Sequence, residues 1–178
     1  STLVNHVDLT EKILGFFEAR FSPDKHTGEV KRKAAQEKIE IDFNEGLDSV
    51  SNLSEDKVLR LYIDLIKATL RTNYYQASPE GKDKTYMSFK LSPKTIPNMP
   101  LPVPVFEIFV YSPRVEGVHL RGGKVARGGL RWSDRLEDYR TEVLGLVKAQ
   151  QVKNAVIVPV GAKGGFVPRR LPSGGTRD

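Results

Sequence analysis

The sequence predicts an α/β fold, a mixed sheet with flanking helices that is preceded by an N-terminal helical segment. Residues 8–70 repeat apolar positions at helical spacing, which is typical of amphipathic helices. From residue 86 onward, short alternating or continuous apolar stretches lie between turn residues, as expected for strands. One further helical stretch lies among these strand candidates, and strands that alternate with helices favour an α/β sheet.

Three helices are expected in the N-terminal segment. The first covers residues 8–20 and ends at Ser22, because the following proline disfavours helical backbone at the residue before it. A charged second helix covers residues 29–49. The third begins at Ser54, a helix-capping hydroxyl followed by acidic residues. Its apolar stripe, which we expect to face the core, consists of Val58, Leu61, Tyr62, Leu65, Ile66, Thr69 and Leu70.

Four strand candidates follow a turn-rich break at residues 79–84. Residues 86–91 and 105–111 alternate between apolar and polar side chains, and the second stretch is rich in β-branched and aromatic residues. Residues 115–120 and 124–132 are the other two candidates, and a Gly-Gly turn separates them. We expect residues 105–111, 115–120 and 124–132 to form one sheet together with residues 155–160.

A helix and a buried strand complete the predicted sheet. Asp134 and Glu137 have the spacing of a capping box, which predicts a helix over residues 135–153 packed on the sheet. Residues 155–160 (AVIVPV) form a continuous apolar run, which suits a strand buried on both faces.

The composition argues against several kinds of site. The 178 residues contain no cysteine and only three histidines, so disulfides, thiolate metal sites and histidine-rich metal sites are not expected. Neither GxGxxG nor GxxxxGK[ST] occurs, so no nucleotide-binding fingerprint is present. No run of about 18 apolar residues or secretory start appears. We therefore expect a cytoplasmic protein with no membrane partner.

The charge is concentrated at the C-terminal end. Residues 112–178 hold 13 of the 28 Lys and Arg residues but only 6 of the 22 Asp and Glu residues. They also hold 11 of the 15 glycines. A basic, glycine-rich segment indicates either an anionic partner, nucleic acid included, or a solvated basic surface.

Lys163 is the first candidate for chemistry. It lies within Gly161–Gly165, a stretch expected to be a loop directly after the buried strand, which is where α/β sheets usually bind ligands. Partial burial would lower the pKa of this lysine and make it a usable general base. The alternative is a glycine-rich turn with an exposed lysine.

Two neighbouring segments add polar groups to the same place. Gln150 and Lys153 share a face at the end of the predicted helix, next to the strand that leads to Lys163. A lysine at a helix C-terminus is also favoured by the helix dipole alone. Arg127 lies in a third cationic, glycine-containing segment. Three such segments meeting at one strand end would suit a substrate with two negative charges.

Three short motifs resemble the substrate-binding domain of glutamate dehydrogenases. They read ARGGLRWSD (126–134), QQVKNA (150–155) and PVGAKGG (159–165), in the order of that family. Longer stretches resemble the very large bacterial NAD-specific members nearly word for word. These stretches are TLRTNYYQ (69–76), FEIFVYSPRVEGVHLRGGKVARGGLRWSD (106–134) and TEVLGLVKAQQVKNAVIVPVGAKGGFVP (141–168). The resemblance covers most of residues 54–178.

The resemblance implies roles for the helix and the lysine. Lys163 matches the catalytic lysine of the family, which is thought to activate water and polarise the substrate carbon. Gln150 and Lys153 match the residues that hold the α-carboxylate of the substrate. The final motif is one residue shorter than the usual family form, because PVGAK stands where that form has Pro-x-Gly-Gly-x-Lys.

The resemblance also implies a binding role for the first motif, with one departure. Arg127 stands where smaller family members have a lysine that holds the distal carboxylate. An arginine can clamp a carboxylate with two hydrogen bonds, so the role is compatible with the change. Lys124 is the alternative for this role. Gly128 and Gly129 complete the motif as substrate-binding residues.

The implied reaction is the NAD-dependent oxidative deamination of L-glutamate to 2-oxoglutarate and ammonia. Residues 1–78 would precede the catalytic domain, and residues 79–178 would form the N-terminal part of its substrate-binding domain. NAD would be bound by a domain absent from this chain, so we expect this chain alone to be inactive and not to bind NAD. The full-length enzyme is expected to be a homo-oligomer with no nucleic-acid partner. The alternative is a non-enzymatic basic module that binds nucleic acid.

Overall fold

The structure is a computed structural model, and it describes the chain except for residues 125–126, 155–160, 172–173 and 175–178. The side chains of residues 153 and 154 also lie outside the described part. The chain divides into two compact units, Ser1–Ala68 and Thr69–Asp178. An N-terminal helical segment and a following mixed sheet with helices confirm the predicted α/β fold.

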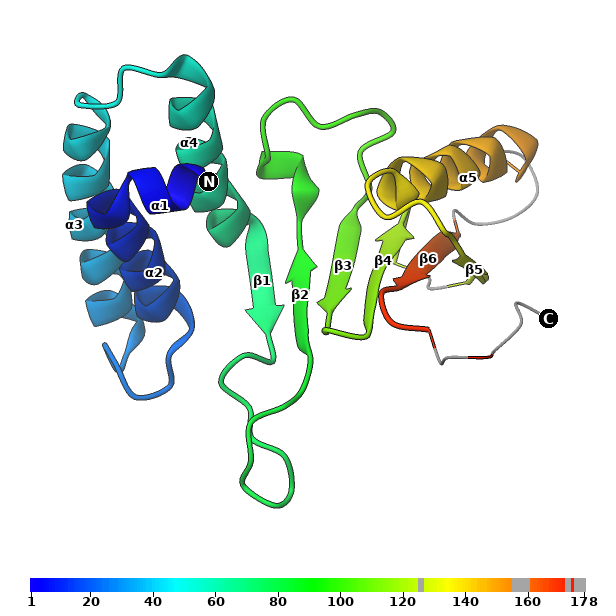
Figure 1. Ribbon diagram of the computed structural model, residues 1–178, viewed down its shortest axis with the longest axis horizontal. Coiled ribbons are helices and arrows are strands. Elements are labelled where there is room, and N and C mark those ends of the chain that lie inside the picture. Colours follow the sequence, from blue (N-terminus) through cyan, green and yellow to red (C-terminus); the bar gives the residue numbers. More distant parts are fainter. Residues whose placement is uncertain (125–126, 155–160, 172–173, 175–178) are drawn as a thin grey trace. The chain divides into compact units, whose positions relative to one another are not determined.

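The first unit is helical throughout its regular structure (Figure 1). The three predicted helices are confirmed, and a short additional helix precedes them. The first predicted helix ends directly before Ser22, as the following proline indicates. The helices are α1 (Thr2–Asn5), α2 (Val7–Phe21), α3 (Glu29–Leu47) and α4 (Leu53–Ala68).

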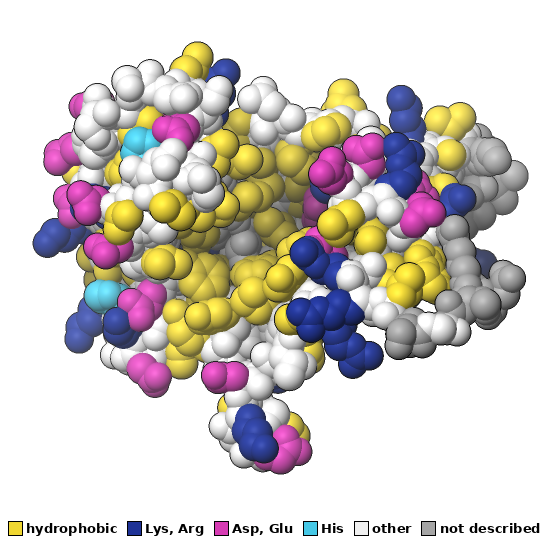
Figure 2. Space-filling view, viewed as in Figure 1, with side chains coloured by type: hydrophobic (Ala, Val, Ile, Leu, Met, Phe, Trp, Pro, Cys, Tyr) yellow, Lys and Arg dark blue, Asp and Glu magenta, His cyan; other side chains and the backbone are white. Residues whose placement is uncertain are grey.

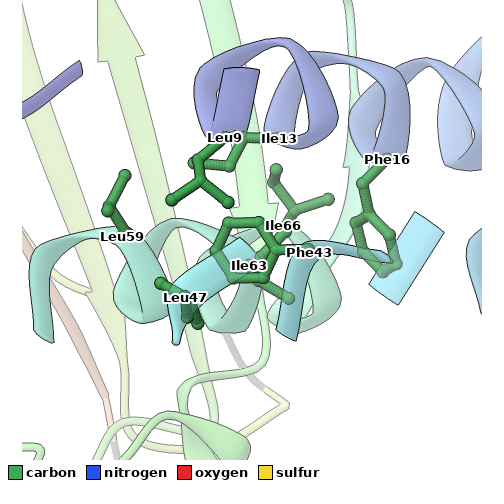
Figure 3. Packing of buried hydrophobic residues seen from close by; sticks show 8 residues of the cluster. All are labelled: Leu9, Ile13, Phe16, Phe43, Leu47, Leu59, Ile63 and Ile66. Atoms are coloured by element: carbon green, nitrogen blue, oxygen red, sulfur yellow. The ribbon is translucent and has the colours of Figure 1, made fainter. Parts of the chain in front are cut away.

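The core of this unit is a cluster of aliphatic and aromatic side chains from α2, α3 and α4. Figure 3 shows the side chains of the three helices converging on one another. The α2 members lie at i, i+4 and i+7, the spacing that places side chains on one helix face. The buried members of the cluster are Leu9, Ile13, Phe16, Phe43, Leu47, Leu59, Ile63 and Ile66.

The predicted core face of α4 is wrong. Leu59 is fully buried and Ile63 nearly so, whereas Leu61 is 42% exposed. Val58 and Tyr62 are also exposed, so of the predicted stripe mainly Ile66 reaches the core. The helix carries apolar residues around much of its circumference, and both stripes have helical spacing. Periodicity therefore could not decide which stripe packs on α2 and α3.

Both ends of α4 also differ from the prediction. The helix begins at Leu53, and Asn52 Oδ1 accepts hydrogen bonds from the backbone N–H groups of Ser54 (2.9 Å) and Glu55 (3.3 Å). Asn52 is thus the capping residue, in place of Ser54. At the other end Thr69 leaves the helix and starts a strand. The helical unit therefore ends at Ala68.

The second unit is built on a sheet of six strands among its described residues (Figure 1). The strand order is β1-β2-β3-β4-β6-β5, and all neighbours are antiparallel except β5 and β6. A short 3₁₀ helix, Pro93–Thr95, lies in the proline-rich link between β2 and β3. The strands are β1 (Thr69–Thr72), β2 (Met87–Leu91), β3 (Phe106–Tyr111), β4 (Val115–Arg121), β5 (Leu130–Trp132) and β6 (Ala162–Pro168).

Helix α5 (Tyr139–Asn154) packs on one face of this sheet over β4 and β6, as predicted for the helix in this region. Side chains of β4, β6 and α5 form the second hydrophobic cluster. Its buried members are Val118, Leu120, Tyr139, Val143, Leu144, Val147 and Val167. Within the described residues, none of the helices is long and apolar enough to cross a membrane.

The strand predicted over residues 124–132 is confirmed only in its last part. Among the described residues of that stretch the strand is Leu130–Trp132, and β6 lies between it and β4. Strand β4 is paired with β3 on one side and with β6 on the other, so β5 can join the sheet only at the outer edge of β6.

The predicted capping box of Asp134 and Glu137 is also wrong, because α5 begins at Tyr139. The backbone N–H of Ser133 still donates to Phe166 O at 2.9 Å, so the chain is paired with β6 up to that residue. It then needs a turn before a helix can begin. The Ser133 Oγ accepts from the backbone N–H of Arg135 within that turn, at 3.1 Å.

The glycine-rich stretch that contains Lys163 is a strand and not a loop. Strand β6 starts at Ala162, and its residues pair in register with β4. Glycines usually mark loops, but here they allow neighbouring elements to approach the strand closely. The strand predicted at residues 155–160 lies outside the described residues.

Candidate active site

The segment Arg127–Gly129 lies directly beside the first half of β6. The backbone N–H of Ala162 donates to Arg127 O at 2.7 Å, and that of Gly164 donates to Gly129 O at 3.1 Å. These two hydrogen bonds extend the pairing of β5 with β6 toward the start of β6. Two of the three sequence motifs are therefore joined through their backbones.

Glycine is required at two positions of this contact. A Cβ atom on Gly128 would lie 2.6 Å from the Ala162 carbonyl carbon and closer still to its oxygen. A Cβ atom on Gly161 would lie 2.6 Å from Arg127 O, and it would also collide with the side-chain amide of Gln150. Both spacings are too short for real Cβ contacts. The absence of side chains at these positions permits the close approach.

Gln150 brings the third motif to the same place. It lies on α5, and its Cδ atom would be 3.0 Å from a Cβ atom on Gly161. The side-chain amide of Gln150 therefore rests on the backbone at the start of β6. The motifs around Arg127, Gln150 and Gly161 thus meet at one end of β6, although they are far apart in the sequence.

Lys163 lies on the face of β6 that α5 covers. Alternate residues of a strand share a face, so Lys163 shares its face with Gly165 and Val167. A Cβ atom on Gly165 would be 2.5 Å from Val143 Cγ2 of α5, and Val167 belongs to the cluster that α5 covers. Lys163 is half-buried and is paired across the sheet with the buried Leu120.

Histidine 119 lies on the other face of the sheet. It is paired with Gly164, and its Cδ2 atom would be 3.2 Å from a Cβ atom there. Burial lowers the pKa of His119, and the nearby positive charge of Arg121 lowers it further. The His119 ring therefore packs against β6 on the face away from α5, where burial disfavours its charged form.

The remaining predicted site residues are less fully placed. Arg127 and Lys124 are exposed, and the Lys124 carbonyl accepts a hydrogen bond from the Arg121 guanidinium. The backbone of Lys153 lies in the last turn of α5, three residues after Gln150. Its side chain is outside the described part of the chain. The family resemblance leads us to expect the Lys153 and Lys163 nitrogens within about 10 Å of each other, the length of glutamate plus one hydrogen bond at each end, and this stays a prediction.

The first turn of α5 carries two polar anchors, which the sequence does not predict. Arg140 donates from Nε and Nη2 to the two carboxylate oxygens of Glu107 in β3, both at 2.7 Å. Glu142 accepts from Ser133 Oγ at 3.0 Å and pairs with Arg131 Nε at 3.3 Å. The partners come from distant parts of the sequence, and no local pattern marks them.

The cationic end of this unit is also interspersed with acids. Figure 2 shows Asp and Glu side chains among the Lys and Arg side chains over the region of α5. The ion pairs of Arg140 with Glu107 and of Arg135 with Asp138 account for part of this mixture. The basic excess of the sequence is therefore partly neutralised around the candidate site.

Among the described residues no side-chain cluster fits a metal ion, and the start of α5 does not fit a dinucleotide. No group of three or more His, Cys, Asp or Glu side chains is arranged to hold a metal in that part of the chain. The turn before α5 lacks glycine and contains Asp134, Glu137 and Asp138. Three acids would repel a pyrophosphate at this helix N-terminus, where a dinucleotide fold would place glycines.

Comparison with known proteins bears on the same motifs. The family model described as bacterial NAD-glutamate dehydrogenase, catalytic domain, matches residues 42–178. The NAD-specific glutamate dehydrogenase of Pseudomonas aeruginosa is 64% identical over 178 residues, which are 100% of this chain and 11% of that protein. The Halomonas elongata enzyme of the same name is 58% identical over 178 residues, again 100% of this chain and 11% of the relative.

A more distant relative extends the same result. The NAD-specific glutamate dehydrogenase of Mycobacterium tuberculosis is 51% identical over 175 residues, which are 97% of this chain and 10% of that protein. The chain thus spans about a tenth of the length of these relatives. The resemblance predicted from the three motifs is confirmed, and the chain belongs to the catalytic-domain family of the bacterial NAD-glutamate dehydrogenases.

Proposed function

We propose that the complete protein catalyses the NAD-dependent oxidative deamination of L-glutamate to 2-oxoglutarate and ammonia. In this proposal the present chain supplies part of the glutamate site. The observation that carries it is the meeting of Arg127–Gly129, Gln150 and Gly161 beside Lys163. The names of the relatives and the family match support the same reaction.

The two carboxylates of glutamate account for the polar groups of the site. Gln150 and Lys153 would bind the α-carboxylate from the end of α5. Arg127 would bind the distal carboxylate through its guanidinium, with Lys124 as the alternative. Hydrogen bonds between ionised partners are about twice as strong as neutral ones. Such a site would select a dicarboxylate over an amino acid with an apolar side chain.

Lys163 would move protons in this reaction. After the α-carbon is oxidised, water adds to the iminium carbon, and a neutral Nζ of Lys163 would take the proton that this water loses. Lys163, now protonated, would then return this proton to the departing amine. The covering helix α5 and the half-buried position of Lys163 support this role, because they limit the access of bulk water to the strand.

NAD would be bound outside this chain, a proposal that the absence of a GxGxxG fingerprint from its sequence supports. We also propose that residues 1–78 precede the catalytic domain and that residues 79–178 form the N-terminal part of its substrate-binding domain. The complete enzyme would be a cytoplasmic homo-oligomer without a nucleic-acid or membrane partner. The mixed charges around α5 give no support to the alternative of a nucleic-acid-binding module.

The test of this function is the Lys163→Ala variant of the complete gene product. We expect glutamate-dependent NAD reduction by the wild-type protein, and a fall in kcat of at least about 10²-fold in the variant, the usual loss for a general acid–base group. Lys148→Ala is the matched control, because Lys148 is exposed on α5 and belongs to none of the three motifs. A Lys163→Ala variant with near wild-type turnover would contradict the catalytic assignment.

Arg127→Ala and Lys124→Ala decide between the two candidates for the distal carboxylate. The variant that removes the true partner should chiefly raise KM for glutamate, because binding common to the ground and transition states is lost. The other variant should leave KM within about twofold of the wild type, since an exposed cation outside the site contributes little. Equal, unchanged KM values in both variants would remove this segment from the glutamate site.

A further inference from the structure

The first turn of α5 is tied to the sheet by a bidentate ion pair. Arg140 Nε and Nη2 each donate to one carboxylate oxygen of Glu107, both at 2.7 Å. The Glu107 side chain is only 12% exposed, so the pair is well shielded from water. The hydrogen bonds that Arg140 donates to Glu107 raise the pKa of Arg140. Two parallel hydrogen bonds fix the orientation of the planar guanidinium as well as its distance from the carboxylate. The pair therefore restrains both the rotation of α5 and its distance from the sheet.

A second anchor holds the same turn on the opposite side. Glu142 accepts a hydrogen bond from the buried Ser133 and pairs with Arg131, both at the end of the sheet formed by β5. Glu107 lies on β3, and β4 and β6 separate β3 from β5. The two anchors therefore brace the helix across three strand spacings, or about 14 Å.

The packing contacts between the anchors act together with these ion pairs. Val143 and Val147 of α5 pack on the sheet through aliphatic groups, and Val143 Cγ2 would lie only 2.5 Å from a Cβ atom on Gly165. Hydrophobic contacts are not directional in themselves, whereas a bidentate pair of a guanidinium with a carboxylate is. The hydrogen-bonded anchors at the first turn therefore add a directional restraint on the rotation of α5 to the restraint that packing provides.

The far end of the helix carries the candidate substrate groups. Gln150 lies ten residues after Arg140, about 15 Å along the helix at 1.5 Å per residue. It rests against Gly161, where little free space surrounds its amide. A rotation at the first turn would turn Gln150 and Lys153 together, because they belong to the same rigid helix. It would move the Gln150 amide away from the start of β6.

We propose that Glu107 is a positioning residue for glutamate binding, acting through Arg140 on the rotation of α5. This inference rests on the function proposed above and deepens it. Glu107 lies on β3 and does not itself touch the substrate. Its carboxylate fixes the helix that presents Gln150 and Lys153 to the α-carboxylate. Lys163 is held by β6 itself, so its role in turnover does not depend on this ion pair.

The test is the Glu107→Gln variant of the complete gene product, with KM and kcat measured separately. We expect KM for glutamate to rise about tenfold, part of the loss that follows when binding groups are misplaced by about 1 Å. The kcat at saturating glutamate should stay within about twofold of the wild type, because Lys163 keeps its position. A merely structural role would lower the amount of folded enzyme and leave KM unchanged.

Arg140→Lys separates the geometry of the pair from its charge. Lysine keeps the positive charge but cannot make the two parallel hydrogen bonds, so KM should rise as in Glu107→Gln. The double variant should have the KM of the single variants, because both remove the same interaction. Arg140→Lys also keeps the test decisive if Glu107→Gln does not fold.

The matched control is Asp138→Asn, which breaks the exposed pair with Arg135 just before the same helix. Its KM should equal that of the wild type. An unchanged KM in folded Glu107→Gln or Arg140→Lys protein would overturn the positioning role while leaving the proposed function intact. A wild-type protein without any glutamate-dependent NAD reduction would instead overturn the proposed function, and this inference with it.

Discussion

Different kinds of contact stabilise the two units of the chain, each within itself. In Ser1–Ala68 the core consists of Leu, Ile and Phe side chains that fill the space between three helices. In Thr69–Asp178 the contacts around the candidate site are made between backbones, where Gly128 and Gly161 leave no room for a Cβ atom. Polar anchors then direct α5 over the sheet. The first unit therefore depends on large apolar side chains on the correct helix faces. The candidate site of the second unit depends on glycines, whose lack of a side chain lets two backbones approach each other.

The largest expected effect comes from Gly128→Ala. The new methyl group would collide with the backbone of Ala162, which cannot rotate away as a side chain can. We expect a destabilisation at or above the upper end of the about 1–3 kcal/mol typical of overpacking, together with loss of glutamate oxidation. Urea denaturation of the 178-residue chain and activity of the complete gene product measure the two effects.

The neighbouring glycine supplies the control for this substitution. Nothing lies within 4 Å of a Cβ atom on Gly129. Gly129→Ala should therefore change stability by less than about 0.5 kcal/mol, as most surface substitutions do. Equal effects at Gly128 and Gly129 would show that the close approach to Ala162 does not limit this segment.

The next largest effect is expected in the helical core. Leu59 is fully buried in the cluster of the first unit, so Leu59→Ala should cost about 2–5 kcal/mol of unfolding free energy, as large-to-small core substitutions do. Leu61→Ala, two residues further along the same helix, should cost less than about 1 kcal/mol because Leu61 is already 42% exposed. The unfolding free energies of both variants, measured by chemical denaturation, compare the α4 face that the structure buries (Leu59) with the face that the apolar spacing predicted to be buried (Leu61).

These two comparisons show which parts of the molecule could be predicted from the sequence. The three long helices, α5 and strands β2, β3 and β4 follow from local periodicity and turn residues, which depend only on neighbouring positions. The buried face of α4 did not follow, because two of its stripes have helical spacing and the choice depends on contacts with α2 and α3. Tertiary packing makes that choice.

The candidate site was predictable to a similar extent. The motifs around Arg127, Gln150 and Lys163 identified the segments that meet. The strand Ala162–Pro168 could not be predicted from the sequence, because glycines are typical of loops. The reason for glycine at these positions is the close packing of β5 and α5 against the strand, which only the structure shows. The anchor between Glu107 and Arg140 joins residues 33 positions apart, and no local pattern records such a pair.

The phenol of Tyr139, in the hydrophobic cluster of β4, β6 and α5, makes the stability of the second unit depend on pH at alkaline values. Burial raises the pKa of Tyr139 to about 12, and the charges of Glu116 and Glu107 contribute in the same direction. The ordinary value is about 10, so the unfolded chain ionises first as pH rises. The stability that the neutral phenol contributes is fully present below about pH 10 and is lost between about pH 10 and 12.

This loss should reach at most about 3 kcal/mol, given about 1.4 kcal/mol for each of two pKa units. Tyr139→Phe removes the ionisable group and keeps the ring. The unfolding free energy of the variant should therefore fall less steeply than that of the wild type between about pH 10 and 12. The measurement is chemical denaturation of both chains at a series of alkaline pH values. Parallel curves for the two chains would show that Tyr139 does not ionise differently in the folded state.

The smallest effect concerns the start of α4, where the sequence and the structure name different capping residues. Asn52 Oδ1 accepts from the backbone N–H groups of Ser54 and Glu55, which have no carbonyl partner of their own within the helix. Asn52→Ala should cost about 0.5–2 kcal/mol, the usual loss for a capping residue. Ser54→Ala should be close to neutral, because Ser54 lies inside the helix and alanine is the better helix former. Thermal or urea unfolding measures the stability of the two variants. A larger loss of stability in Ser54→Ala than in Asn52→Ala would show that Ser54 is the capping residue, as the sequence pattern alone predicts.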